Sequence, residues 1–321
     1  MGVNRTASVC LAGALAFGIA GLGTSAFAAD MAVKAPYKAP EPEGLDVHGF
    51  IDISFKNDYI TPRGLLVTNT GLTTQILGGF AWDLYKSKDG FINGVSVYTY
   101  VWNDLWSKQN HPKVGSWNEF DWAVGTSIKF AQHWKFGVEY VEFLSPPGHF
   151  SQERNVEFSL AYDDSWMGFP ITINPYVKLF YEASGPSTVT TGKNGQIYDI
   201  EIGMVPTLGL KKYTGLPITL SAPTWITVGP AAYWNIGGNV CGANLCSTDN
   251  AGVFSTGLTA KWAVDIVPKR LGSWYAKAGF QYYRILNDNL LYAQTLVGTA
   301  ATFDTAHKDI TVGFAGVGTN F

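Results

Sequence analysis

The sequence predicts an all-β fold, an antiparallel transmembrane β-barrel of about twelve strands, and three features carry this prediction. Only 15% of the residues are charged while 14% are aromatic, so part of the protein surface must be apolar. Polar and apolar residues alternate with a period of two in segment after segment. The connections between these segments are alternately short and long, as they are in membrane barrels.

Residues 1–28 are expected to be a signal peptide. Arg5 precedes an uncharged, largely apolar run from Thr6 to Phe27, and the run ends at Ala28 in a small-residue cleavage motif. A transmembrane helix is the alternative interpretation. The run is rich in Gly, Ala and Ser and is followed by a proline-rich segment, which favours the signal peptide.

Residues 29–44 hold three prolines between charged residues, which predicts an extended periplasmic spacer, and the barrel is then expected over residues 45–321. The formal net charge of −3 offers no electrostatic footprint for nucleic acid, so that class of partner is excluded. No uninterrupted apolar run long enough for a membrane helix follows the signal peptide. A mature protein that enters a membrane would therefore cross it as strands.

The alternation is clearest from Asn118 to Phe130. Phe120 and Val124 share one face of this segment, and Glu119 and Asp121 share the other. Charged residues confined to one face of a strand must point into water or into a polar interior. A soluble β-sandwich also has one buried face, so alternation alone leaves both folds open.

Connection lengths favour the barrel. Strands are predicted near residues 45–60, 73–85, 91–104, 117–130, 134–143, 153–163, 171–183, 196–209, 217–235, 252–266, 272–285 and 308–321. With the first strand starting in the periplasm, every long connection falls on the outside and every short one in the periplasm.

Tryptophans near the ends of these strands predict aromatic girdles at the two membrane interfaces, because an amphipathic ring is stable at the headgroup level. They are Trp102, Trp106, Trp117, Trp134, Trp166, Trp225, Trp234, Trp262 and Trp274.

The chain ends in an aromatic residue, Phe321, in phase with Val317. A terminal aromatic on an alternating strand resembles the signal that the outer-membrane assembly machinery reads. That machinery, outer-membrane lipid and lipopolysaccharide are the expected partners, and the oligomeric state is left open. Ile310 and Phe314 lie in the opposite phase, so we expect a bulge near Gly316 to reconcile the two halves of the strand.

Residues 54–64, Ser-Phe-Lys-Asn-Asp-Tyr-Ile-Thr-Pro-Arg-Gly, resemble the first-hairpin segment S-x-Y-x-x-R-G of the TorF-type outer-membrane porins of proteobacteria, with three extra residues between Ser54 and Tyr59 and one between Tyr59 and Arg63. The stretch ADMAVKAP after the cleavage site is similar to leaders of rhizobial outer-membrane proteins. The resemblance implies an outer-membrane barrel and a channel, and it names no solute.

Few residues suggest catalysis. Outer-membrane lipid hydrolases set a Ser and a His close together on the outer wall, and His149, in a predicted outer loop, is the one histidine we would test for that role. The ordinary reading, a polar loop histidine, is favoured. The sequence holds no motif for a cofactor or a metal, so neither is expected. Cys241 and Cys246 lie close together in another predicted outer loop, and an oxidising compartment favours a disulfide between them.

Charged residues on the predicted inner face would line a hydrated lumen or fill it as an ion-pair network. They are Asp52, Lys56, Asp83, Glu119, Asp121, Lys129, Lys135, Glu139, Glu157, Lys178, Glu182, Asp199, Glu201, Lys261, Asp265 and Lys277.

Barrels of about twelve strands lie between the filled eight-stranded barrels and the wide channels of 16–18 strands. We therefore expect a narrow pore for passive passage of small hydrophilic solutes. Ten carboxylates against six lysines in the predicted lining make it mildly cation-preferring. The alternatives are a closed structural or adhesion barrel with functional extracellular loops and, less favoured, an outer-membrane lipid hydrolase.

Overall fold

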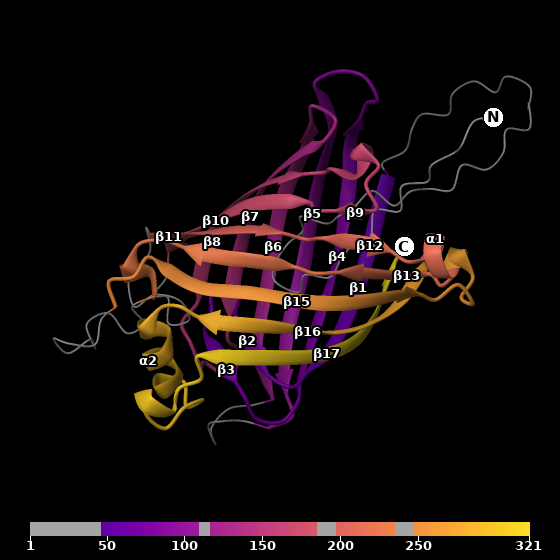
Figure 1. Ribbon diagram of the computed structural model, residues 1–321. Coiled ribbons are helices and arrows are strands. Elements are labelled where there is room, and N and C mark those ends of the chain that lie inside the picture. Colours follow the sequence, from indigo (N-terminus) through magenta and orange to yellow (C-terminus); the bar gives the residue numbers. More distant parts are fainter. Residues whose placement is uncertain (1–45, 109–115, 185–196, 235–246) are drawn as a thin grey trace, which may run out of the picture.

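The computed structural model describes residues 46–108, 116–184, 197–234 and 247–321. The expected signal peptide and proline-rich spacer lie outside this part of the chain. The described residues form a closed antiparallel β-barrel of 12 wall strands, which confirms the predicted fold class (Figure 1). No helix in the described ranges is long and apolar enough to cross a membrane.

Each wall strand pairs with its neighbours in sequence, and the last strand pairs with the first. The undivided wall strands are β1 (Asp46–Lys56), β4 (Thr73–Lys86), β5 (Ile92–Trp106), β6 (Trp117–Phe130), β7 (Trp134–Leu144), β8 (Glu153–Tyr162), β15 (Ala251–Ala263), β16 (Ser273–Ile285) and β17 (Asp309–Asn320). The divided ones are β9 (Ile171–Thr172) with β10 (Pro175–Ser184), β11 (Ile197–Met204) with β12 (Thr207–Gly209), and β13 (Ile218–Ser221) with β14 (Thr224–Val228).

The connections carry the remaining elements. The first connection at the end with the long loops contains a small hairpin, β2 (Tyr59–Ile60) and β3 (Leu66–Thr68), and the last contains α2 (Asp288–Leu296) and η5 (Phe303–Thr305). The other short helices are η2 (Ser165–Met167), α1 (Lys211–Thr214), η3 (Ala231–Trp234) and η4 (Lys269–Leu271).

Side chains of the wall strands alternate between the lumen and the outer surface, as the period of two predicts. In β6, Glu119 and Asp121 are 3% and 0% exposed on the inner side, whereas Val124 is 44% exposed on the outer side. Ile51 and Phe280 are likewise large apolar residues that face outward and stay exposed. An apolar outer band on a closed barrel is stable in hydrocarbon, so this is the surface of a membrane barrel.

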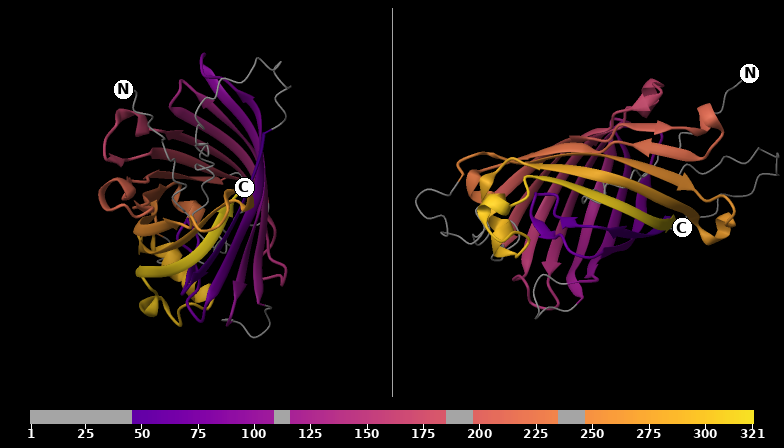
Figure 2. Two further views of the ribbon diagram at one scale, coloured as in Figure 1. Left: turned by 90° about the vertical axis from the view of Figure 1, so that its right-hand side faces the viewer. Right: turned by 60° about the horizontal axis from the view of Figure 1, so that its bottom comes forward.

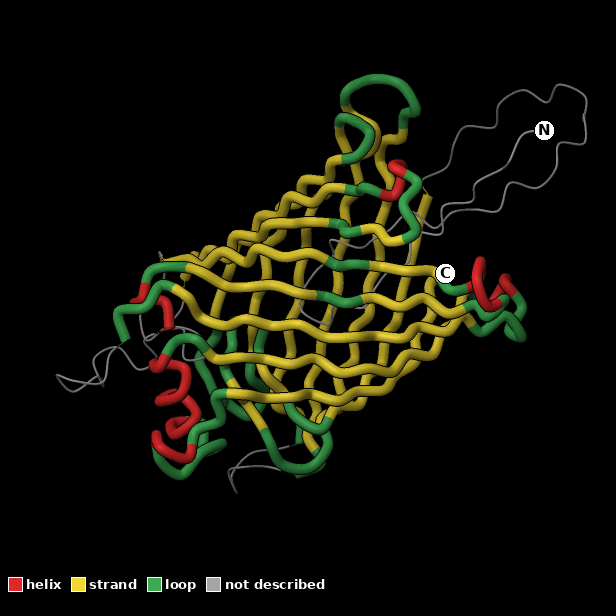
Figure 3. The backbone as a smooth tube through the Cα atoms, viewed as in Figure 1, coloured by secondary structure: helices red, strands yellow, loops and turns green. Residues whose placement is uncertain are grey.

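Three neighbouring wall strands are interrupted at one level, where the sequence predicts continuous strands. The breaks fall at Asn174, which has a positive φ, and at Pro206 and Pro223, which have no N–H to give to the ladder (Figure 3). Backbone hydrogen bonds nevertheless cross the breaks, from Ala222 N to Pro206 O at 2.8 Å and from Gly257 N to Pro223 O at 3.1 Å. The strands are therefore interrupted there, but neighbouring strands remain hydrogen-bonded across the breaks.

The shortest connections, 87–91 and 131–133, lie at one end of the barrel, and the longest fully described ones, 57–72 and 286–308, lie at the other, as predicted. Connection 145–152, expected among the long ones, is no longer than 163–170 at the opposite end. Gly49 N donates to Phe321 O at 2.6 Å, so the first strand begins and the last strand ends at the same end of the barrel. We call this the terminal end. The opposite end, which we call the loop end, carries α2, and Figure 2 shows this helix at the far side of the barrel from the C-terminus. The connections that are described in full at the loop end are 57–72, 145–152 and 286–308.

The last strand, β17, contains no bulge near Gly316, so that expectation is wrong. Its pairing with both neighbours runs without a register shift. Ile310 and Val312 face inward and are buried in an apolar cluster inside the loop end, while Val317 faces outward. The two apolar halves of the strand are thus in opposite phases because each is buried against a different medium, protein in one case and membrane in the other.

Some of the predicted girdle tryptophans face the membrane side of the wall and others are buried inside the barrel, which corrects part of the girdle prediction. Trp117, Trp134, Trp166, Trp262 and Trp274 are exposed and suit the predicted girdles. Trp102, Trp106, Trp225 and Trp234 are buried inside the barrel, at 0–5% exposure. Sequence position near a strand end does not distinguish these two groups.

Candidate functional site: the charged interior

The inner face of the wall holds most of the charged residues that the sequence singles out. Ten of them are buried: Asp52, Glu119, Asp121, Glu139, Glu157, Lys178, Glu182, Asp199, Glu201 and Lys277. Lys56, Asp83, Lys129, Lys135 and Lys261 occupy inner-face positions and are partly buried. Asp265 is an exception, because β15 ends before it and its side chain is exposed in the following turn.

Strand register brings carboxylates from distant parts of the sequence into one row. Glu139 of β7 lies directly opposite Glu157 of β8. Glu157 is opposite Phe180 of β10, and Phe180 is opposite Asp199 of β11. The ring of Phe180 therefore lies between the carboxylates of Glu157 and Asp199. The carboxylate of Glu139 extends the row on the other side of Glu157. Like charges directly opposite each other are destabilising, so this row favours a cation close by.

The cation comes from the first connection at the loop end, which folds into the barrel. Thr61 O accepts from Gly64 N at 2.9 Å, which closes a turn with Pro62 at its second position. Thr61 N also donates to Leu65 O at 2.8 Å. Gly64 has φ +96°, a conformation that glycine adopts without strain. This turn, residues 61–65, which we call the tip, presents Arg63 to the far wall.

Arg63 lies over the carboxylate row. Its Cζ is 4.7 Å from the ring centroid of Phe180 and 5.3 Å from that of Phe143. Its Nη2 is 3.5 Å from Glu157 Oε1, and its Nε is 3.9 Å from Asp199 Oδ1. Burial by itself would lower the pKa of Arg63, but the neighbouring acidic groups raise it overall, so the guanidinium stays charged.

Sequence reasoning treats residues 61–71 as an outer loop and gives Arg63 no role. The segment that resembles the TorF-type porins includes it, together with Tyr59, and that resemblance was the available signal. In the structure Tyr59 OH donates to Glu119 Oε2 at 3.1 Å, and its ring lies 5.5 Å from that of Trp102. The segment therefore contacts the inner wall at two separate places.

Apolar packing holds the tip inside the barrel. Leu65 and Leu66 belong to a buried cluster with Trp234 of η3 and Leu290 of α2. Thr299 Oγ1 donates to Leu66 O at 3.1 Å, which joins the first and last connections of the loop end. The loop end of the lumen thus contains an apolar plug of loop residues, and the acidic row lies on the wall beside it.

A second charged group closes the seam between the first and last strands. Lys277 Nζ of β16 is 2.7 Å from Asp52 Oδ1 of β1, and Tyr275 OH donates to Asp52 Oδ2 at 2.6 Å. Both side chains reach over β17, where Gly316 and Gly318 leave room for them. Asp52 and Lys277, expected to line a lumen, are therefore paired with each other.

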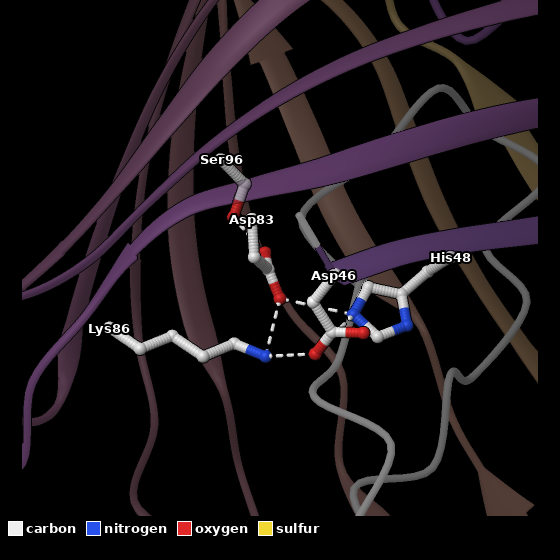
Figure 4. Close-up of polar contacts among 5 residues, drawn as sticks. All are labelled: Asp46, His48, Asp83, Lys86 and Ser96. Carbon is white, nitrogen blue, oxygen red and sulfur yellow. Dashed lines mark hydrogen bonds and ion pairs between the residues drawn. The ribbon is translucent and has the colours of Figure 1, made fainter. Parts of the chain in front are cut away.

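A third group lies at the terminal end (Figure 4). Lys86 Nζ is 2.5 Å from Asp46 Oδ2 and 2.9 Å from Asp83 Oδ2, while His48 Nε2 is 3.0 Å from Asp83 Oδ2. Ser96 Oγ donates to Asp83 Oδ1 at 2.5 Å. The two carboxylates and the imidazole have the atoms of a metal site, but the lysine ammonium already lies against both carboxylates. We interpret the group as an ion-pair clasp between β1, β4 and β5.

The sequence also singled out His149 and the pair Cys241 and Cys246 as candidates. His149 packs its ring 5.7 Å from that of Trp106, and its Nδ1 is 2.7 Å from Asn118 Oδ1. Ser145 Oγ accepts from the backbone N of His149 and donates to a backbone carbonyl, which is a loop-closing role. The expected Cys241–Cys246 disulfide lies outside the described residues.

Comparisons with known proteins agree on the fold. No protein-family model and no curated protein sequence matches the chain. Among solved structures it is similar to an outer membrane channel from Pseudomonas putida F1, with a TM-score of 0.50 and 10% identity over 88% of this chain and 97% of that one. It is also similar to OprB from Pseudomonas putida, with a TM-score of 0.40 and 9% identity over 87% of this chain and 94% of that one. OccD1 (OprD) aligns with a TM-score of 0.33 and 10% identity over 87% and 96% of the two chains. At such identities the likeness concerns the fold, and this chain has the fold of the bacterial outer-membrane barrels.

Proposed function

We propose that the chain is an outer-membrane pore that gives passive passage to small hydrophilic solutes and mildly prefers cations. The observation that carries this is the charge balance of one side of the lumen. Eight buried carboxylates lie on the inner faces of β6, β7, β8, β10 and β11: Glu119, Asp121, Glu139, Glu153, Glu157, Glu182, Asp199 and Glu201. The inner-face cations of the same strands are Lys129, Lys135 and Lys178, and Arg63 of the tip lies against the row.

An excess of carboxylates over cations gives a lumen a negative potential, which raises the local concentration of cations and lowers that of anions. Mobile ions screen this potential over about 8 Å at physiological salt, so the preference should be mild there and stronger in dilute salt. Burial of carboxylates in excess of cations is costly, and in this proposal water and mobile cations that enter the lumen offset that cost.

Reversal potentials in planar bilayers test this proposal. The purified barrel should conduct, and in a potassium chloride gradient its reversal potential should indicate cation preference. Replacing Glu119, Asp121, Asp199 and Glu201 by Gln or Asn should lower the cation-to-anion permeability ratio, most clearly at low salt. An unchanged ratio would contradict the assignment of these groups to the ion path.

The matched control changes the net charge by the same amount outside the lumen. Asp163, Asp249, Asp265 and Asp304 are exposed in connections, and their replacement by Asn should leave the permeability ratio of the parent intact. A ratio that falls equally in both variants would mean that the net charge of the protein, rather than its lining, sets the preference.

A closed barrel with functional loops is the second candidate, and the apolar plug at the loop end favours it. Leu65, Leu66, Trp234 and Leu290 are each at most 2% exposed, so solvent does not reach them. A parent protein that inserts into bilayers and never conducts would favour this candidate over the pore. Conductance at any stable level would favour the pore.

The orientation and partners form part of the same proposal. Removal of residues 1–28 would leave the terminal end in the periplasm and the loop end outside. The assembly machinery would recognise the last strand with its terminal Phe321, and lipid and lipopolysaccharide would contact the outer band. Sequencing the N-terminus of protein from the native outer membrane should give Ala29, and retention of Met1 would contradict the proposal.

A further inference from the structure

We propose that the place where Arg63 lies is a binding site for solutes that carry a guanidinium group, and that Arg63 occupies it as a tethered competitor. We call this place the Arg63 seat and define it by the rings of Phe143 and Phe180 and the carboxylates of Glu157 and Asp199. The inference rests on the proposed pore function and names the solute class for which that pore would have a specific site.

The shape of the seat matches a planar cation. Two phenyl rings lie 4.7 and 5.3 Å from Arg63 Cζ, and a carboxylate from a neighbouring strand lies on each side of Phe180. A guanidinium group is planar, stacks on aromatic faces and is more weakly hydrated than an ammonium. A small metal ion would use the carboxylates and gain nothing comparable from the rings.

The contacts of Arg63 are loose for a buried ion pair. Its Nη2 and Nε lie 3.5 and 3.9 Å from Glu157 and Asp199, whereas the Lys277–Asp52 pair in the same barrel has a separation of 2.7 Å. Charge-assisted hydrogen bonds are typically about 2.7–2.9 Å long. The same two nitrogens of Arg63 make no hydrogen bond among the described residues.

Arg63 leaves the carboxylate of Glu157 in need of further donors, whereas Asp199 also lies against the hydroxyl group of Tyr233. Both oxygens of Glu157, whose side chain is 4% exposed, are buried without an N–H or hydroxyl donor among the described residues, and their polar neighbour is the carboxyl group of Glu139. Glu139 lies directly opposite it, and Glu153 is buried two inner-face positions along the same strand. A ligand that offers several N–H donors can satisfy oxygens that Arg63, held by its short tip, leaves unpaired.

A solute that enters the seat must compete with Arg63, which the tip holds close to the site. A group on a short connection has an effective concentration on the order of millimolar at its own site. A free guanidinium solute therefore binds weakly to the parent, and removing the Arg63 guanidinium should raise its affinity without any other change to the seat. The affinity gain should vanish when the two carboxylates are neutralised.

Calorimetry with methylguanidinium chloride on the purified full-length barrel tests the site directly. Arg63→Gln should raise the association constant about tenfold or more over the parent, as release of a tethered competitor requires. The Arg63→Gln, Glu157→Gln, Asp199→Asn variant should lose this gain. Tetramethylammonium, a cation with no N–H donor, should show no gain in any variant.

Lys129→Gln is the matched control, because it also removes one inner-face cation, on β6 and outside the seat. An equal gain for Lys129→Gln and Arg63→Gln would overturn the proposal in favour of general electrostatics. If Arg63→Gln fails to fold, as judged by heat-modifiable mobility, Arg63→Lys replaces it and should still raise the affinity, because an ammonium competes less well for a stacked planar site.

Bilayer recordings separate failure of the site from failure of the pore. A barrel that conducts while no variant binds methylguanidinium would overturn the seat and leave the pore standing. A barrel that binds it as predicted but never conducts would support the seat and overturn the pore. When both hold, methylguanidinium should reduce the current at lower concentration in Arg63→Gln than in the parent, and the reverse order would contradict the seat.

Discussion

Gly316 of β17 should be one of the least replaceable residues of the barrel, because the seam closes across it. In register it lies between Ser54 of β1 and Lys277 of β16. A Cβ at this position would lie 2.4 Å from Ile53 O, 3.0 Å from Ser54 Oγ and 3.1 Å from Lys277 Cε. The nearest of these atoms is backbone, so Gly316→Ala must displace β1 itself as well as the lysine that reaches over to Asp52.

The expected cost follows from two opposing effects. Overpacking of a filled site typically costs about 1–3 kcal/mol. Replacing a strand glycine by alanine returns roughly 0.5–1 kcal/mol, because the unfolded chain loses conformational freedom. The free energy of unfolding should therefore fall by up to about 2.5 kcal/mol, before any weakening of the Lys277–Asp52 ion pair adds to the loss.

Gly313→Ala on the same strand is the control. Within 4 Å its added Cβ would meet only Asn57 Oδ1, at 3.8 Å. Denaturant unfolding of both variants in lipid vesicles, followed by tryptophan fluorescence, gives the two free energies under identical conditions. Equal stability of the two variants would refute the argument that packing at the seam, rather than strand propensity, requires glycine at 316.

Three further predictions concern the seam, the redox state and the orientation. Lys277→Met should destabilise the barrel by up to about 3–5 kcal/mol, because it leaves the buried carboxylate of Asp52 without its cation. Adding Asp52→Asn should restore most of the loss in the same unfolding assay. Protein from the native membrane should gain the mass of two alkyl groups, at Cys241 and Cys246, only after reduction, and alkylation without reduction would disprove the disulfide. With these two cysteines replaced by Ser, a membrane-impermeant thiol reagent should label Thr248→Cys but not Lys88→Cys on intact cells, and the reverse pattern would invert the barrel.

The wall of the barrel could be predicted from the sequence because its physics is local. A strand places successive side chains on opposite faces, so the alternation around Glu119 and Asp121 was sufficient to identify which face is polar. Connection length separated the two ends except at 145–152, which is as short as 163–170 at the opposite end. The same local rules failed at Pro206 and Pro223, where the apolar pattern continues through residues that cannot donate to the ladder.

The interior was decided by register and by loops that fold back, and neither leaves a periodic signal in the sequence. Glu157, Phe180 and Asp199 form one row only because three strands pair at one particular offset. Arg63 reaches that row because the tip packs against η3 and α2, which lie more than 150 residues away in the chain. By itself, the sequence predicted a membrane barrel with a polar inside, since alternation assigns the two faces of each strand and the connection lengths favour a barrel over a sandwich. Only the tertiary structure decided which charges meet, since their contacts depend on the relative placement of segments that are far apart in sequence.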